Sequence, residues 1–280
     1  MIVSTKEMLE KAFQSHYAIV QFNINNLEWT KFILEKCNEM QKPVILGVSE
    51  SAIHYMGGYN VVVNMIKGLI FDLRIVIPVA IHLDHGSSIE SCQKAIEAGF
   101  TSVMIDASKY DIETNIKITK KVVEIAHPNK VTVEAEIGRV GGMEDKIASE
   151  IYYANVEESY RLVKETNIDS LAPSVGNVHG LYKGDPKLNF ELIQQISQKV
   201  KIPLVLHGGT GIDEEKIKKA ISCGIAKLNI NTELQVAWSN AIRKYLDENK
   251  DIYDPRKIIQ SGENAIKQVI ENKLHLLEQQ

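Results

Sequence analysis

Hydrophobic and polar positions along the chain form short apolar runs separated by longer stretches with helical spacing. The apolar runs are rich in β-branched residues and recur at roughly 30 residues, as expected of parallel strands that alternate with helices. The predicted strands are 17–23, 43–49, 75–80 with its continuation to His85, 101–106, 130–136, 169–173, 203–207 and 226–232. The predicted helices are 27–40, 58–73, 88–98, 111–126, 156–166, 190–199, 213–223 and 233–248, with further helical material over 254–277.

Eight strand–helix pairs predict an α/β fold, a closed (β/α)8 TIM barrel, formed as a single domain over residues 1–280 with a C-terminal helical extension. The alternative is an open doubly wound sheet, which would carry a glycine-rich dinucleotide fingerprint after its first strand. Here the first strand runs into residues 23–27, and no glycine occurs before Gly47. The pattern therefore favours the barrel.

Composition excludes several classes of function. The formal net charge is −4, which argues against a nucleic-acid-binding surface. No apolar run approaches the ~18 residues that a membrane helix needs, and residues 1–10 lack a signal-peptide pattern. The three cysteines lack metal-type spacing, which favours reduced thiols. We therefore expect a cytoplasmic protein that binds neither nucleic acid nor membrane.

Polarity changes abruptly where the third predicted strand ends, at Asp84, His85 and Gly86. Ligands bind at the carboxyl ends of strands in parallel α/β proteins, so this pair lies where chemistry usually happens. Adjacent side chains diverge, so one could bind a metal while the other moves a proton. The alternative is a hydrogen-bonded structural pair.

Further polar residues end other predicted strands. His85, His179 and His207 would meet at one end of the barrel, and three histidines suit a zinc site with an open position. Asp106 and Glu136 lie at the same rim, as a second set of metal donors or as hydrogen-bonding partners. His82 lies within its strand, and we interpret it as a core residue or as a residue that supports a metal ligand.

Two loops resemble phosphate-binding loops. Residues 208–211 (GGTG) and 229–232 (NINT) follow the seventh and eighth strands and precede helices, where backbone N–H groups can bind an anion. A third stretch, residues 141–145, is expected to be an irregular, mobile loop that closes over substrate. Its Glu144 could act as a general base, or it could be a solvated loop acid.

These motifs together resemble class II, zinc-dependent fructose-1,6-bisphosphate aldolases, over essentially the whole chain. The matching runs are LDHG at 83–86, VMIDAS at 103–108, VEAEIGRVGGMED at 133–145, VHGLYKG at 178–184, LHGGTGI at 206–212 and NINTE at 229–233. Asn177 departs from the family pattern, which more often has Ser or Thr there. The resemblance implies reversible cleavage of fructose 1,6-bisphosphate to dihydroxyacetone phosphate and glyceraldehyde 3-phosphate.

The resemblance also implies roles for individual residues. His85, His179 and His207 would bind zinc, with Asp106 and Glu136 as a second metal position. Asp84 would protonate the aldehyde oxygen during condensation, and Glu144 would take the proton from dihydroxyacetone phosphate. The implied phosphate ligands are Gly180, Gly208, Gly209, Thr210, Asn229, Ile230, Asn231 and Thr232, near a monovalent cation (Na⁺ or K⁺), with Ser49 and Lys183 assisting. Arg256 would reach the far phosphate from a neighbouring subunit, which implies a homodimer.

Three alternatives remain open at the level of sequence. A Schiff-base aldolase needs a reactive lysine at the carboxyl end of a strand, whereas Lys130 and Lys227 lie at strand starts. A tagatose-1,6-bisphosphate aldolase of the same family more usually has Gly-Ala-Ser in the loop that here reads Gly208-Gly209-Thr210. A non-catalytic phosphosugar-binding or adhesion protein would be expected to lack Asp84, Glu144 or a histidine ligand.

Overall fold

The computed structural model describes residues 1–144, 147–149, 152–180, 184 and 186–277. For residues 142–144 and 147–149 only the course of the backbone is described. Within these residues no helix is both long and apolar enough to cross a membrane.

Eight parallel strands close into a barrel, which confirms the predicted fold. Their order around the barrel is β1-β11-β10-β8-β5-β4-β3-β2, so the first and last strands pair and seal the sheet. The barrel strands are β1 (Ile19–Asn23), β2 (Val44–Ser49), β3 (Val79–Gly86), β4 (Ser102–Ile105), β5 (Thr132–Ile137), β8 (Ser170–Pro173), β10 (Leu204–Leu206) and β11 (Ile225–Ile230).

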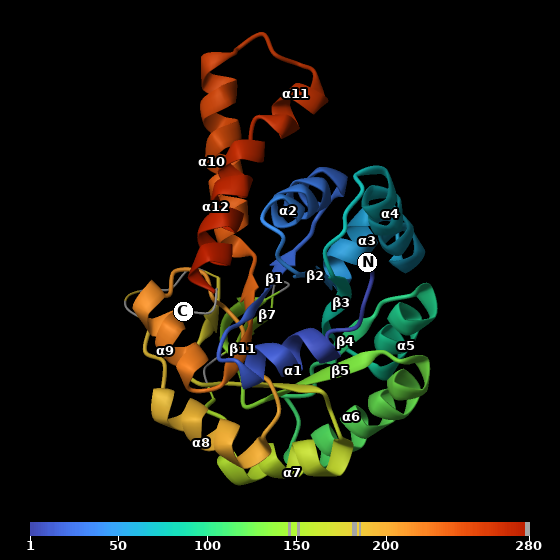
Figure 1. Cartoon of the computed structure of the whole chain (residues 1–280), viewed down its shortest axis with the longest axis vertical. Helices are drawn as coiled ribbons and strands as arrows, with labels where there is room; N and C mark the ends of the chain where they lie inside the picture. The colour runs from blue at the N-terminus through green and yellow to red at the C-terminus, as the bar shows by residue number, and fades with distance from the viewer. Residues whose placement is uncertain (145–146, 150–151, 181–183, 185, 278–280) are drawn as a thin grey trace.

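Helices surround the barrel (Figure 1). They are α2 (Leu27–Glu39), α3 (Glu50–Met56), α4 (Tyr59–Asp72), α5 (Ile89–Ala98), α6 (Ile112–Ala126), α7 (Val156–Thr166), α8 (Phe190–Val200), α9 (Glu214–Ser222) and α10 (Thr232–Glu248), with a 3₁₀ turn η1 (His127–Asn129). Several of these helices are preceded by a capping residue whose side chain accepts a hydrogen bond from a backbone N–H of the first turn. Examples are Asn26 before α2, Ser88 before α5 and Asn155 before α7. Helix α3 was not predicted, and it is separated from α4 by Gly57, whose φ of 103° ends the first helix.

A helix before the first strand closes the amino-terminal end of the barrel. On α1 (Lys6–Gln14) the apolar residues Met8, Leu9 and Ala12 pack against a ring of small and branched side chains from the strand starts. Figure 1 shows α1 lying across this end of the barrel. Helix α1 therefore covers part of the end of the barrel opposite the predicted site residues.

The carboxyl-terminal helices extend beyond the barrel. Helices α10, α11 (Pro255–Gln260) and α12 (Glu263–Leu276) form a projection on one side of the molecule (Figure 1). Helix α12 returns along α10 and packs against α2, which anchors the projection.

A small second sheet lies beyond the end of β5, formed by β6 (Gly141–Glu144), β7 (Ile147–Ser149) and β9 (Val178–His179). The prediction of irregular structure over 141–145 is therefore wrong for residues 141–144, which form strand β6, and residues 142–144 pair antiparallel with β7. Strand β6 also pairs with β9, and Gly142 is opposite His179. This pairing holds the segment that carries Glu144 beside a predicted metal ligand.

Candidate active site

Three histidines that are far apart in the sequence meet at the carboxyl-terminal end of the barrel. His85 belongs to the end of β3, His179 to β9, and His207 directly follows β10. Their ring centroids lie 4.7–5.7 Å apart, and each offers a nitrogen within 4.8 Å of the other two. The predicted convergence of these rings is confirmed.

The backbone conformation at His85 explains why the adjacent side chains of Asp84 and His85 point in different directions. Its φ of 51° lies in the left-handed region, which is uncommon for residues other than glycine. The His85 ring Nδ1 lies 3.1 Å from Asp106, whose other oxygen accepts from the Ser108 hydroxyl. Burial disfavours a charged ring, but the Asp106 hydrogen bond and the Asp84 charge outweigh it and raise the pKa of His85 well above its usual value.

Asp84 points into the barrel and is held by two amides. Asn23 donates to one carboxylate oxygen at 2.7 Å, and Asn229 donates to the other at 3.4 Å. Gln21 donates in turn to Asn23, and its side chain fills the space that a Cβ at Gly47 would need. Burial would raise the pKa of Asp84, but the charges of His85 and His207 hold it below its usual range, so the carboxylate is ionised at neutral pH.

A chain of buried polar groups lies beneath His207. Its Nε2 is 3.1 Å from Glu134, and the Lys227 ammonium donates to the same carboxylate at 2.7 Å. Burial would raise the pKa of Glu134, but the Lys227 charge and the His207 hydrogen bond hold it well below its usual value. An ionised Glu134 accepts a hydrogen bond from Nε2–H, which leaves the lone pair of His207 on Nδ1.

Several buried atoms at this site lack a hydrogen-bond partner within the described part of the chain. They include His207 Nδ1, His179 Nε2 and Glu136 Oε2. The His207 and Glu136 atoms face each other at 3.2 Å without hydrogen-bond geometry. Orphaned lone pairs that converge from imidazoles and a carboxylate are the donor set of a zinc site, so the residues fit zinc.

Two groups of side chains could hold a metal ion. The first is His85, His179 and His207, and the second is His85, Asp106 and Glu136. They share His85, so the structure brings together all five residues predicted as metal ligands. Asp106 matches both expectations, because its carboxylate could bind a metal and it is also a hydrogen-bonding partner of His85.

The predicted phosphate loops border a small cavity beside the histidines. It is lined by Asn23, Asp84, His85, His179, Gly180, Gly208, Thr210, Asn229, Asn231 and Thr232. Gly208 has a φ of 65°, and a Cβ there would collide with the Val178 carbonyl oxygen, so the close approach of this loop to β9 requires glycine. Gly209 is less restricted, because a Cβ there would lie 2.6 Å from the end of the Leu228 side chain, which would have to shift.

Some predicted residues lie elsewhere. Ser49 is buried at the start of α3, where its hydroxyl caps the helix. Arg256 lies on α11, 88% exposed, and pairs with Asp254 at 2.9 Å, so it does not reach the site of its own chain. For Glu144 only the backbone is described, and Lys183 lies outside the described residues. Gly209 and Ile230 adjoin the cavity-lining residues without lining the cavity themselves.

Three polar residues that support the site were not predicted to do so: Asn23, Glu134 and Lys227. Lys227 had been placed at the amino-terminal end, but it is fully buried inside the barrel, and its bond to Glu134 keeps it away from the cavity. A usable signal was the two-residue spacing of Glu134 and Glu136, which puts both on one side of a strand. His82 is confirmed as a core residue, with a pKa lowered to about 3 by burial and by the Lys227 charge.

Asn177, the residue at which the resemblance to the family departs, connects two segments of the site through its side-chain amide. Its side chain accepts from the Val175 N–H at 2.9 Å and donates to the His207 carbonyl at 3.1 Å. The amide therefore connects the loop after β8 to the backbone of His207, one of the candidate metal ligands.

A closed (β/α)8 barrel with a histidine and carboxylate cluster at its open end places this chain among metal-dependent barrel enzymes. Comparison with known proteins identifies the family. The model of the class-II fructose-bisphosphate aldolase family matches residues 3–280. Fructose-bisphosphate aldolases from Geobacillus stearothermophilus and Staphylococcus epidermidis are 56% and 54% identical over 274 residues, which is 98% of this chain and 96% of each relative.

Solved structures agree with the sequence relatives. The YdjI aldolase from Escherichia coli K12 superposes with a TM-score of 0.86 at 33% identity, covering 100% of this chain and 98% of that one. A fructose-bisphosphate aldolase from Campylobacter jejuni gives a TM-score of 0.83 at 25% identity, covering 99% and 95%. The chain belongs to the class-II fructose-bisphosphate aldolase family.

Proposed function

We propose that the chain is a zinc-dependent enzyme that reversibly cleaves fructose 1,6-bisphosphate to dihydroxyacetone phosphate and glyceraldehyde 3-phosphate, a step of glycolysis and gluconeogenesis. The observation that carries the proposal is the convergence of His85, His179 and His207 beside the buried Asp84 and the two glycine- and asparagine-rich loops. Such a site supplies a Lewis acid, a proton-transfer group and an anion site within one cavity.

The three histidines would hold the zinc. When bound, zinc would act as a Lewis acid that stabilises the negative charge developing at the C2 oxygen. Glu134 fixes the tautomer of His207, and Asp106 orients His85, so two of the three rings are held by carboxylates of the chain.

Asp84 would carry the proton of the C4 hydroxyl. In cleavage its ionised carboxylate accepts this proton, the C4–O bond becomes a carbonyl, and the electron pair of the broken C3–C4 bond passes to C3 and the adjacent C2 carbonyl. In condensation Asp84 returns the proton to the aldehyde oxygen. Asn23 and Asn229 orient the carboxylate for both directions. We assign the proton at C3 to Glu144, on the strand that pairs with β9.

The phosphate of the dihydroxyacetone phosphate half would lie against Gly180, residues 208–210 and residues 229–232. Backbone N–H groups and the start of α10 favour an anion there, and a Na⁺ or K⁺ ion would offset part of its charge. Ser49 and Lys183 would assist. The far phosphate would be bound by Arg256 of a second copy, so the working unit is a homodimer. The three free cysteines favour a reducing compartment, and we place the enzyme in the cytoplasm.

A chelator experiment tests the metal requirement. Removal of zinc should abolish cleavage of fructose 1,6-bisphosphate, and added zinc should restore it. Borohydride with substrate should leave no lysine adduct, because the Lys227 ammonium is bound to Glu134 and lies outside the cavity. A trapped adduct with full activity after zinc removal would contradict the proposal.

A second candidate substrate is tagatose 1,6-bisphosphate, which differs from the fructose ester only in configuration at C4. The loop sequence Gly208-Gly209-Thr210 favours the fructose ester. The ratio of kcat/KM for the two bisphosphates decides between them, and a higher value for the tagatose ester would assign the alternative.

A further inference from the structure

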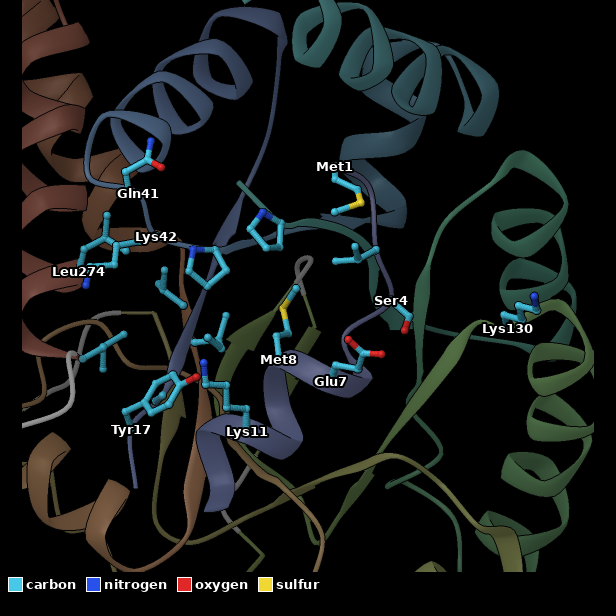
Figure 2. Close-up of a pocket in the computed structure, with 17 residues that line it drawn as sticks. Met1, Ser4, Glu7, Met8, Lys11, Tyr17, Gln41, Lys42, Lys130 and Leu274 are labelled. Carbon is cyan, nitrogen blue, oxygen red and sulfur yellow. The ribbon is translucent and has the colours of Figure 1, made fainter. Parts of the chain in front are cut away.

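A cavity of about 860 Å³ lies at the end of the barrel opposite the histidines. It is bordered by α1, the starts of β1 and β2, and the end of α12, and none of its lining residues belongs to the candidate active site. Figure 2 shows the side chains of Lys11, Tyr17 and Met8 around its centre. Its size falls within the range of small-molecule sites.

The walls of this cavity are mainly apolar. Met8, Ile19, Leu274 and Leu277 line it and are each at most 9% exposed. Val3 and Pro43 add further apolar surface. A ligand that fills the cavity would therefore need a hydrocarbon or aromatic part to match these walls.

The charged residues at the cavity are mostly basic. Lys11, Lys42 and Lys130 line it, against one acid, Glu7, whereas the whole chain has a net charge of −4. Across the described part of the chain, the Lys11 ammonium has no ion-pair partner, although Glu7 is one helical turn away. Burial raises the pKa of Tyr17, so its hydroxyl stays protonated and can donate a hydrogen bond. The polar groups therefore favour an anion.

We propose that this cavity binds a small amphipathic organic anion, with its apolar part between Met8 and Leu277 and its acidic group at Lys11 and Tyr17. A free phosphate would leave the apolar walls unmatched, and a neutral hydrocarbon would leave the Lys11 ammonium unmatched. An aromatic or aliphatic carboxylate satisfies both parts of the lining.

The probe is 1-naphthylacetate, added to the zinc-loaded full chain labelled with ¹³C at the methionine methyl groups. Met8 lines the cavity, whereas Met104 lies buried within the barrel, so the two methyl resonances separate local from general effects. The Met8 resonance, assigned with the Met8→Leu variant, should shift saturably while Met104 stays unchanged. The readout requires no turnover, so its outcome is independent of the proposed aldolase activity.

Matched variants test the assigned contacts. Lys11→Glu should weaken binding about fivefold, whereas Lys6→Glu, on an exposed part of the same helix outside the cavity, should change it less than about twofold. The neutral 1-naphthylacetamide should also bind about fivefold more weakly.

Three results would each overturn the proposal. The first is the absence of a saturable Met8 shift, and the second is an equal loss of binding in both lysine variants. The third is binding only after residues 278–280 are deleted, which would assign the cavity to the chain's own end.

Discussion

Asp84 and His85 are adjacent in sequence, yet only His85 joins the metal-binding group. The left-handed backbone at His85 turns its ring toward Asp106, while Asp84 keeps the inward direction of β3 and is bound by Asn23 and Asn229. A carboxylate so held cannot rotate away when the substrate hydroxyl approaches. The proposed separation of metal binding from proton transfer therefore depends on the backbone conformation of one residue.

Asp84→Asn should reduce kcat by about 10²–10⁴-fold, because the amide cannot accept the C4 hydroxyl proton. Bound zinc should remain at one equivalent per chain, since Asp84 is not in either metal-binding group. Metal analysis with steady-state kinetics checks both. Asp111→Asn, at the exposed cap of α6, is the control and should keep full activity. Loss of zinc in Asp84→Asn would contradict the assignment.

Glu134→Gln should weaken zinc binding about 10- to 100-fold, because His207 loses the carboxylate that fixes its tautomer. Competition with a chromophoric chelator measures this without turnover. The unpaired Lys227 would also destabilise the fold by about 3–5 kcal/mol. The double variant Glu134→Gln with Lys227→Met removes that charge and should recover stability while zinc binding stays weak. Recovery of zinc binding in the double variant would show that Glu134 acts only through stability.

Zinc affinity should fall as the pH is lowered. The Asp106 hydrogen bond and the Asp84 charge raise the pKa of His85 well above its usual value, so its ring keeps a proton to higher pH than an ordinary histidine, whereas a metal ligand must be neutral. Because zinc must displace this proton, the apparent zinc affinity should fall about tenfold for each pH unit below that pKa. Chelator competition between about pH 6 and pH 8 measures the slope. Asp106→Asn should flatten it, because the hydrogen bond that raises the pKa is lost. A flat wild-type profile would contradict the expectation.

Much of the site could be predicted because most of its candidate metal ligands lie at the carboxyl ends of strands. His85, Asp106, Glu136 and His207 all stand where a strand ends, and the barrel brings strand ends together. Asn23 and Glu134 could not be assigned in this way. Glu134 lies within β5, and although Asn23 is the last residue of β1, an amide there has many possible partners. Their roles depend on contacts with Asp84 and His207, which come from other strands.

At the level of elements, periodicity predicted all eight barrel strands, since each is a short buried run bounded by polar residues. It did not predict α1 or α3. Helix α3 is short and begins directly at Ser49, at the end of a strand, so its apolar residues merge with the preceding pattern. Strand β6 was also missed, because glycines dominate it and its stability comes from pairing with β7 and β9.

Leu9→Ala should lower the free energy of unfolding by about 2–5 kcal/mol, because it leaves a cavity between α1 and the barrel end. Chemical denaturation measures the loss. The exposed neighbour Glu10 provides the control, and Glu10→Ala should change stability by less than about 0.5 kcal/mol. Equal effects for the two variants would show that α1 does not support the barrel through its apolar face.

For the whole molecule, the helical projection of α10, α11 and α12 carries Arg256, which is 88% exposed and pairs only with Asp254 among the described residues, in agreement with a role in a second copy. Arg256→Ala and Asp84→Asn should each be inactive alone. Co-expressed as mixed dimers, they should recover about one quarter of wild-type activity, because half of the dimers carry one intact site. No recovery would contradict a shared site.

The pairing of β1 with β11 has a consequence for the newly made chain. Asn23 leaves the ribosome among the first residues, but Asn229, the second amide on Asp84, and Lys227, the partner of Glu134, are made more than two hundred residues after it. A nascent chain can therefore carry all three histidines and still lack one amide that holds Asp84 and the ammonium that holds Glu134. We therefore expect the site to reach its final arrangement only at the end of synthesis, when the last strand closes the barrel.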